Sequence, residues 1–355
     1  MVTRLLLPVA VAIAALSGAA AAAAATPPPP PAAPAPGVVP APGPYAWAEP
    51  AAARLAADGD WPELAGADLA RDATRADLDR AIGVLTGVPR SRPNPARPAT
   101  AWSAHLLVVR ALGLEAERRS LNRLATDDGA RLRLPRHFGS EVLVRELGLV
   151  HNHPAQRDDL ERSRRQALAL GDLVHMLDRA REVSTWERQE LSRYREIALP
   201  TMSPARRAVV QAALWQVGQN YVWAGDWPGV RSPWGAQAHG GFDCSGLVWW
   251  AFKGSAGPRQ MELGRGLLGR TADAMAWERP AERAPVGALA PGDLVFFGRG
   301  GPKARRGSIS HTGIALGNGW MVHSSGSRGG VSVSFLGTYW PSATAFGRHV
   351  AELGA

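Results

Sequence analysis

The sequence predicts an α+β fold, in which a mainly helical domain (residues 45–201) precedes a mixed domain of helices and strands (residues 202–355). Apolar residues recur at helical spacing up to about Thr201. Beyond Pro200 the chain becomes rich in Gly, Trp and short β-type runs, and one Gly-Asn-Gly turn between apolar runs predicts a hairpin. A length of 355 residues is sufficient for two such domains.

Met1–Ala25 has the composition of a secretory signal peptide. A basic residue, Arg4, precedes an apolar stretch and a run of alanines. The alternative is an uncleaved membrane anchor, because the apolar run continues to Ala25. In either case we expect the folded part of the protein to be exported.

Thr26–Pro44 is dominated by Pro and Ala, and predicts an extended linker of roughly 60 Å. The chain carries a net charge of +9, and a leader containing only Arg4 would leave about +8. This charge either attracts anionic wall polymers or serves solubility alone. Because the basic residues are scattered and form no nucleic-acid-binding motif, we expect no nucleic acid partner.

The helical domain contains a short internal repeat, Leu-Gly-Leu. Ala111–Leu114 and Glu146–Leu149 each close a helical stretch with Leu-Gly-Leu. This pattern resembles the surface-layer-homology type of wall-binding repeat; the alternative is a helical domain that only packs on its neighbour. We expect helices over four segments, Asp68–Leu85, Thr100–Leu114, Ser140–Leu149 and Asp158–Arg181.

The chain has one cysteine, so in an exported protein it has no partner for an internal disulfide. The apolar spacing after Cys244 predicts a buried helix that begins at or near this residue. Unpaired amide hydrogens and the helix dipole at that position favour a thiolate, and a lowered thiol pKa suits a nucleophile. We therefore predict that Cys244 is a nucleophile rather than an inert buried thiol.

Two histidines lie on either side of the predicted hairpin turn, Gly317-Asn318-Gly319. If all three residues form the turn, Leu316 pairs with Trp320, and His311 and His323 become diagonal neighbours on one sheet face. A two-residue turn would put them on opposite faces unless a bulge intervened. With His311 as base and His323 orienting it, the residues would complete a Cys–His–His triad.

Four strings resemble, in order and type, the NlpC/P60 cysteine peptidases: Tyr221–Gly225, Phe242–Val248, Pro291–Phe297 and the strand pair that carries His311 and His323. The resemblance covers about residues 203–350. It implies a papain-like α+β core, with the nucleophile's helix packed on an antiparallel sheet. It also implies a peptidoglycan substrate, cut next to D-γ-glutamyl and a diamino acid through a thioester acyl-enzyme, without cofactor or metal. The protein would then act in the cell envelope or cell wall.

The resemblance also assigns roles to three neighbours of the triad. Tyr221 would line the site and stabilise the oxyanion, and Asp243 and Ser245 would contact the amino end of the substrate peptide. The sequence departs from the family pattern at Ala224, where the family often has glycine. Two long segments that flank the nucleophile would wall the groove, Asp226–Gly240 and Lys253–Ala288.

Two other functions fit parts of the sequence. A CHAP-type amidase would share the Cys/His pair, but the Asp-Cys-Ser-Gly-Leu-Val string and His323 favour the peptidase. A catalytically silent wall-binding protein could keep the fold, but the intact triad disfavours it. His151-x-His153 has no cysteine or acidic cluster at zinc spacing, so we expect a surface loop there and no metal site.

Overall fold

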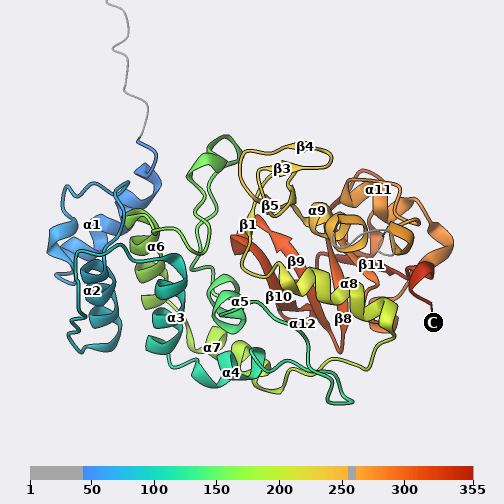
Figure 1. Ribbon diagram of the computed structural model, residues 1–355, viewed down its shortest axis with the longest axis horizontal. Helices are drawn as coiled ribbons and strands as arrows, with labels where there is room; N and C mark the ends of the chain where they lie inside the picture. The colour runs from blue at the N-terminus through green and yellow to red at the C-terminus, as the bar shows by residue number, and fades with distance from the viewer. Residues whose placement is uncertain (1–42, 255–260, 355) are drawn as a thin grey trace, which may run out of the picture. The chain divides into compact units, whose positions relative to one another are not determined.

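The computed structural model describes residues 43–254 and 261–354, which belong to one compact unit (Figure 1). The predicted signal peptide, Met1–Ala25, and nearly all of the predicted linker lie outside the described residues. Among the described residues, no helix is both long and apolar enough to cross a membrane. The predicted boundaries at residues 25, 44 and 201 stay predictions.

The first half of the described chain is helical, as predicted, but the helix expected over Asp158–Arg181 is wrong in its first part, because α6 begins only at Leu170. Side chains cap several helix starts: Thr74 accepts from the Asp77 amide, and Ser184 accepts from the Glu187 amide in the same way. Short 3-10 turns connect the helices, including η3 (Ala155–Leu160) and η4 (Arg193–Glu196). The α-helices are α1 (Glu49–Ala57), α2 (Arg75–Thr86), α3 (Ala101–Ala111), α4 (Glu115–Leu121), α5 (Phe138–Glu146), α6 (Leu170–Arg181) and α7 (Thr185–Ser192).

The starts of α2, α3 and α6 are joined by a triangle of backbone hydrogen bonds. The amide of Ala73 donates to Leu168 (2.7 Å), that of Ala99 to Ala73 (2.8 Å), and that of Leu168 to Ala99 (2.9 Å). The three helices also pack against one another in pairs. The helical region therefore has a core in which three similar helices start from one point.

The Leu-Gly-Leu repeat is explained locally by the way in which helices α3 and α5 end. Gly113 and Gly148 have φ angles of 75° and 65°, which a glycine adopts without strain. The next amides reach back five residues, from Leu114 to Val109 (3.1 Å) and from Leu149 to Val144 (2.8 Å). Both helices thus end in the same Schellman motif. The wall-binding role of this region stays a prediction.

The helical region buries charged side chains in pairs. Glu141 is fully buried on α5 and accepts hydrogen bonds from His105 (2.9 Å) and Arg145 (2.6 Å). The expected surface loop at His151–His153 is wrong, because His153 is only 2% exposed and its ring contacts Glu161 at 3.2 Å. Among the described residues, no three His, Cys, Asp or Glu side chains are grouped to hold a metal.

The second half of the chain is built on a six-stranded antiparallel sheet in the order β10-β9-β8-β7-β11-β6. A smaller sheet, β1-β5-β2, brings Tyr221 beside Phe242 in parallel register. The α-helices of the region are α8 (Pro204–Trp215), α9 (Cys244–Trp249), α11 (Ala272–Trp277) and α12 (Leu336–Tyr339) among the described residues, and α9 packs on β8 and β9. This arrangement confirms the predicted α+β class.

The longest strand is β8, which carries His311. In the large sheet they are β6 (Arg283–Ala284), β7 (Leu294–Gly298), β8 (Ile309–Gly317), β9 (Trp320–Ser325), β10 (Gly330–Phe335) and β11 (Thr344–Arg348). In the small sheets they are β1 (Asn220–Tyr221), β2 (Asp226–Trp227), β3 (Arg231–Ser232), β4 (Gly235–Ala236) and β5 (Gly241–Phe242).

The β8–β9 hairpin differs from the predicted three-residue turn. Gly317 pairs with Trp320 across a two-residue turn, so the predicted Leu316–Trp320 pairing is wrong. A bulge lies at Leu316, after which Ala315 pairs with Met321. The bulge consumes one residue of β8 and restores the register that the longer turn would have given. His311 and His323 therefore still share a sheet face.

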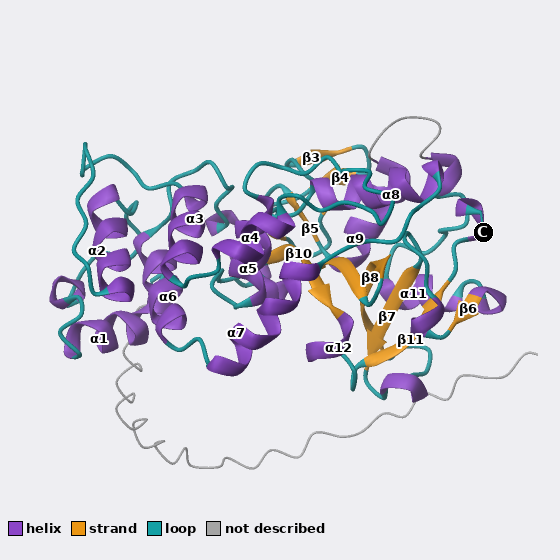
Figure 2. Ribbon diagram, turned by 90° about the horizontal axis from the view of Figure 1, so that it is seen from below, coloured by secondary structure: helices purple, strands orange, loops and turns teal. Residues whose placement is uncertain are grey.

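The helical region lies directly against the end of the sheet. α5 packs on β10, and Figures 1 and 2 both draw these two elements side by side. The hydroxyl of Tyr194, from η4, donates to the carbonyl of Val333 on β10 at 2.7 Å. Side chains at the end of α5 can therefore reach residues of the sheet.

Candidate active site

Cys244 is the first residue of α9, as predicted, and Asp243 is its N-cap. The Asp243 carboxylate accepts a hydrogen bond from the Gly246 amide at 2.5 Å. A Cβ atom at Gly246 would collide with the carbonyl oxygen of Gly225, so only glycine lets the helix start lie this close to the preceding loop. The thiol is thereby held at a buried helix start, with 9% of the residue exposed.

The expected lowering of the thiol pKa is wrong for the resting site. Burial and the neighbouring Asp243 carboxylate raise the pKa of Cys244 to about 11. The backbone amides of Thr312 and Ser245 face the sulfur and lower the pKa, but by less than burial raises it. The amide of Thr312 also shows that the sulfur lies against β8, next to the position of His311.

His311 and His323 meet across the hairpin. Nε2 of His311 lies 2.9 Å from Nδ1 of His323, and the two rings are nearly perpendicular. The residue between them on the sheet face is Gly313, where an added Cβ would lie only 3.1 Å from Cβ of His323. Nε2 of His323 is in turn 2.8 Å from the hydroxyl of Ser334 on β10. The pairing that the hairpin permitted is therefore present.

Both imidazoles are held in the neutral form. Burial lowers the pKa of His311 to about 4. Burial also lowers the pKa of His323 well below its ordinary value, and the nearby His311 and Arg328 lower it further. Trp340 covers the pair from one side: its ring is stacked on His311 at 5.3 Å between centroids, and edge-on to His323 at 5.1 Å.

Tyr221 ends β1, near enough to Cys244 for the two side chains to interact electrostatically. Burial raises the pKa of its hydroxyl, and the nearby Cys244 and Asp243 raise it further. A Cβ added at Gly326, the residue after β9, would lie 3.6 Å from the ring of Tyr221. The ring therefore also lies close to the end of β9. The structure thus brings Tyr221 to the same place as the predicted nucleophile.

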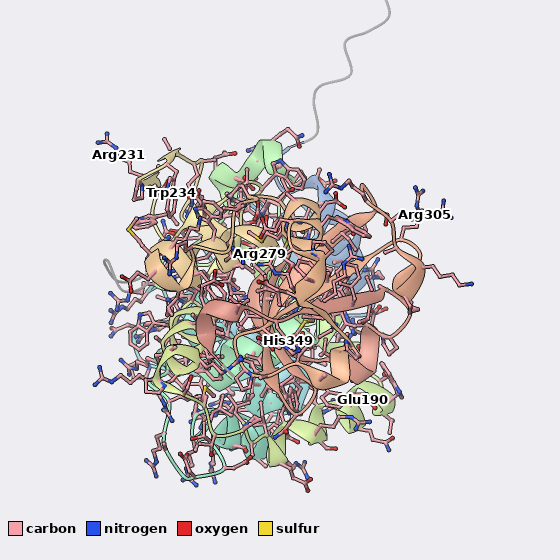
Figure 3. All side chains as sticks on the ribbon, turned by 90° about the vertical axis from the view of Figure 1, so that its right-hand side faces the viewer. Glu190, Arg231, Trp234, Arg279, Arg305 and His349 are labelled. Atoms are coloured by element: carbon pink, nitrogen blue, oxygen red, sulfur yellow. The ribbon has the colours of Figure 1, made fainter. Side chains whose placement is uncertain are left out.

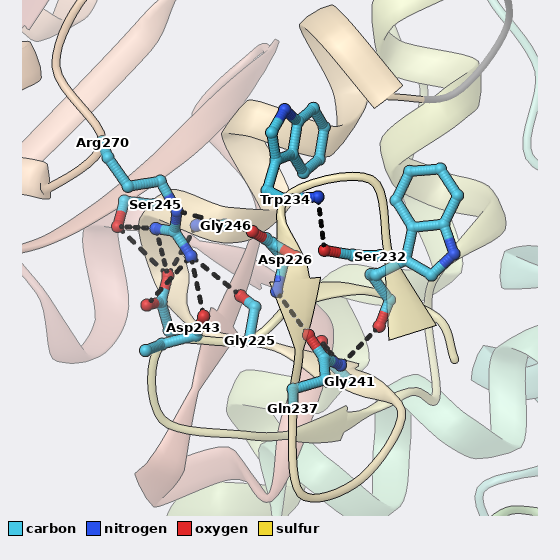
Figure 4. A network of polar contacts seen from close by, with 12 residues as sticks. Gly225, Asp226, Ser232, Trp234, Gln237, Gly241, Asp243, Ser245, Gly246 and Arg270 are labelled. Carbon is cyan, nitrogen blue, oxygen red and sulfur yellow. Dashed lines mark hydrogen bonds and ion pairs between the residues drawn. The ribbon is translucent and has the colours of Figure 1, made fainter. Parts of the chain in front are cut away.

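Asp243 and Ser245 are both engaged by Arg270 (Figure 4). The guanidinium donates to the Asp243 carboxylate (3.2 Å) and to the Ser245 hydroxyl (2.9 Å). The same guanidinium binds the carbonyls of Ala224 (3.1 Å) and Gly225 (3.2 Å). Arg270 therefore joins the loop before β2 to the start of α9. Its sequence context, a long segment without a motif, gave no signal for this role.

The segment Asp226–Gly240 folds back on α9 rather than standing free. Trp227 packs edge-on against Trp250 at 4.5 Å between centroids, and Gln237 donates to the carbonyls of Trp227 and Gly241. The far end of the segment is exposed: Arg231 and Trp234 lie at the periphery of the molecule in Figure 3. One end of the segment thus supports the helix that begins at Cys244, and the other faces solvent.

Comparison with known proteins identifies this region. The family model described as NlpC/P60 family matches residues 218–348, which contain all six predicted site residues. These residues belong to the NlpC/P60 family. Within this NlpC/P60 domain, Ala224 has a φ of 58°, a left-handed conformation that disfavours any residue with a Cβ. The departure from the glycine of the family pattern therefore carries a conformational cost.

The NlpC/P60 region also matches individual proteins. It is 40% identical over 122 residues to the probable endopeptidase Rv2190c of Mycobacterium tuberculosis, covering 34% of this chain and 23% of the relative. It is 32% identical over 149 residues to the murein DD-endopeptidase MepH of Escherichia coli, covering 39% of this chain and 47% of MepH. The chain thus spans less than half the length of these relatives.

A solved NlpC/P60 structure is similar as well. The P60 domain of the Mycobacterium avium subspecies paratuberculosis antigen MAP1204 is 32% identical, with 41% of this chain and 94% of that chain covered and a TM-score of 0.30.

Proposed function

We propose that the protein is an exported cysteine endopeptidase that hydrolyses peptide bonds in peptidoglycan stem peptides. The observation that carries the proposal is the hydrogen-bonded pair of His311 and His323 in an NlpC/P60 domain, where the amide of Thr312, the residue after His311, faces the Cys244 thiol. In this proposal Cys244 is the nucleophile, His311 is the base and His323 orients His311.

The hydrogen bond between the histidines decides which ring nitrogen serves as the base. Nε2 of His311 is occupied by His323, which leaves Nδ1 for the thiol. Nδ1 takes the thiol proton as the sulfur attacks the substrate carbonyl carbon. The C–N bond then breaks, His311 returns the proton to the leaving amine, and a thioester remains. Water, deprotonated by the same nitrogen, hydrolyses the thioester.

The resting site holds a neutral thiol and a neutral imidazole, because the pKa of Cys244 is raised to about 11 and that of His311 lowered to about 4. Proton transfer therefore accompanies attack on the bound substrate. Tyr221, near Cys244, is the proposed stabiliser of the oxyanion, because a phenol that keeps its proton can donate a hydrogen bond to it.

Asp243 and Ser245, which we propose contact the substrate's amino end, are already bound by another group. Both side chains already bind Arg270, so a substrate ammonium has to share these acceptors with the guanidinium or displace it. The predicted cut next to D-γ-glutamyl and a diamino acid, and a location in the cell envelope, belong to this proposal. The first fits the family and the second the predicted leader.

The test is digestion of purified peptidoglycan with the full-length protein, followed by mass spectrometry of the released fragments. We expect new peptide termini within stem peptides or cross-links, and their loss in Cys244→Ala. Iodoacetamide should abolish the activity, because Cys244 is the only cysteine. Retained activity in Cys244→Ala would overturn the proposal.

The same experiment separates the CHAP-type amidase. An amidase would release whole stem peptides from the glycan and leave the bonds within them intact. Binding to peptidoglycan without any new fragment would instead indicate a silent wall-binding protein.

A further inference from the structure

The histidine pair is connected to a carboxylate of the helical region. Glu146 is the last residue of α5, and 4% of it is exposed. Its Oε1 atom accepts hydrogen bonds from the hydroxyls of Ser334 (2.7 Å) and Ser332 (3.0 Å), both fully buried on β10. Ser334 is also the serine whose hydroxyl lies 2.8 Å from Nε2 of His323. The contacts form one continuous chain from Glu146 to His311.

We propose that Glu146 is a positioning residue for the histidine pair, acting through Ser334 to fix which nitrogen of each ring carries the proton. This inference rests on the proposed function, in which His311 is the base. It adds to that function a group from outside the NlpC/P60 domain, since the family match begins at residue 218.

Counting hydrogens along the chain gives a single arrangement. Ser334 has one hydroxyl hydrogen and gives it to Glu146, so its oxygen must accept from Nε2–H of His323. A neutral His323 with its proton on Nε2 has a bare Nδ1, which accepts from Nε2–H of His311. Nδ1 of His311 is then bare, and it is the nitrogen that the thiol proton needs.

Without the carboxylate, the opposite arrangement would satisfy the same distances. Ser334 could turn its hydroxyl hydrogen toward Nε2 of His323, which would put the proton of His323 on Nδ1. His311 would then have to accept at Nε2 and carry its own proton on Nδ1. In that tautomer His311 cannot take a proton from Cys244. An ionised carboxylate accepts hydrogen bonds and has no hydrogen to give, so Glu146 excludes this arrangement.

Other contacts hold Glu146 in place. Arg328, between β9 and β10, donates to the backbone carbonyl of Glu146 at 2.6 Å, and its guanidinium lies 3.9 Å from the carboxylate. The positive charge of Arg328 also lowers the pKa of His323 and so disfavours an imidazolium there. The carboxylate of Glu146 lies close to Arg328 and opposes this effect. When His311 gains the thiol proton, the Glu146 carboxylate at the far end of this series of hydrogen bonds stabilises the new positive charge.

The two serines of β10 give a matched test in the full-length protein. Both are fully buried and both donate to Glu146, but only Ser334 contacts a histidine. We expect Ser334→Ala to lower kcat on soluble muropeptides by about tenfold or more with KM unchanged, and Ser332→Ala to keep kcat within about twofold. Glu146→Gln should lower kcat in the same direction as Ser334→Ala. Equal kcat in the two serine variants would overturn the proposal.

A spectroscopic measurement tests the tautomers directly and needs no substrate. In ¹⁵N-histidine-labelled wild-type protein, we expect His311 and His323 both to be protonated on Nε2 and bare on Nδ1. In Ser334→Ala, His323 should lose this single tautomer, whereas Ser332→Ala should keep it. A proton on Nδ1 of His323 in the wild type would overturn the inference even if a variant failed to fold. Failure of the proposed function would appear separately, as activity retained in Cys244→Ala.

Discussion

The helical region and the two sheet strands beside it, β9 and β10, bury polar side chains of different kinds. In the helical region they include an ion pair in which both partners are buried, Glu141 with Arg145. On β9 and β10 the buried polar residues are the imidazole of His323 and serine hydroxyls, for example Ser332. A buried charge costs several kcal/mol unless it is paired, whereas a buried hydroxyl needs only a hydrogen bond.

The difference shows that the two regions contribute different groups to the surroundings of the histidine pair. Strands β9 and β10 supply neutral groups at fixed distances, and burial keeps both imidazoles uncharged at rest. The negative charge at the end of their hydrogen-bond chain comes from the helical region, through Glu146. One serine, Ser334, thus separates the Glu146 carboxylate from His323.

The largest expected effect comes from comparing one buried histidine of each region. His323→Ala should lower kcat by about 10²- to 10⁴-fold, because His311 loses the partner that orients it. His105→Ala, which removes a ring bonded to Glu141 in the helical region, should lower stability but keep kcat of the folded protein. Steady-state kinetics and thermal melting of both variants check this. Similar kcat values in the two variants would contradict the claim that only the histidine of the sheet acts on turnover.

Glu141→Gln tests the ion pairs of the helical region. It should lower the free energy of unfolding by about 3–5 kcal/mol, because it leaves Arg145 buried without its partner. Burial raises the pKa of Glu141, but His105 and Arg145 lower it more, to about 2. The wild type should therefore lose this stability as pH falls from about 4 to 2, since the folded pKa lies below that of the unfolded chain.

The measurement for Glu141 is urea unfolding of wild type and variant at neutral and acidic pH. The two proteins should differ least at the lowest pH. A difference that stayed constant with pH would show that the carboxylate charge is not what stabilises this region.

The resting state of the sheet's site is tested by the pH dependence of thiol alkylation. With the pKa of Cys244 raised to about 11, the thiolate fraction grows about tenfold for each pH unit below that value. The rate of iodoacetamide labelling should therefore rise about a hundredfold from pH 7 to pH 9. Because the chain has one cysteine, mass spectrometry of the intact protein follows this residue alone. A rate that levels off below pH 8 would indicate a preformed thiolate.

The smallest expected effect concerns backbone strain at Ala224, in the loop that Arg270 joins to the start of α9. Ala224→Gly should stabilise the protein by up to about 1 kcal/mol, because glycine adopts the left-handed φ of 58° without the cost that alanine bears. Its carbonyl, which accepts from Arg270, is unchanged. Thermal melting checks this, with Ala236→Gly on the exposed β4 as the control that should gain nothing. A lower melting temperature for Ala224→Gly would contradict the account.

Much of the fold could be predicted because its signals are local. Helical periodicity identified the first region, the apolar spacing after Cys244 identified α9, and the glycine-rich turn identified the β8–β9 hairpin. The resemblance to NlpC/P60 peptidases was carried by short strings in a fixed order, and the family match confirms it. The roles of the six site residues stay predictions.

The sequence could not decide details that depend on competing local forces. A three-residue turn, or a two-residue turn with a bulge, would each bring the histidines to one face, and only the structure shows that the hairpin has the second. The raised pKa of Cys244 depends on how much water the folded chain excludes from the thiol, which outweighs the effect of the helix start.

By itself, the sequence determined the order of the two regions, the helix that starts at Cys244 and the strands that carry the histidines. Only the tertiary structure decided that Arg270 binds Asp243, that Trp340 stacks on His311 and that Glu146 reaches Ser334. The reason is separation along the chain: spacing within a segment fixes which face a residue takes, but contacts between residues far apart form only when whole elements pack together.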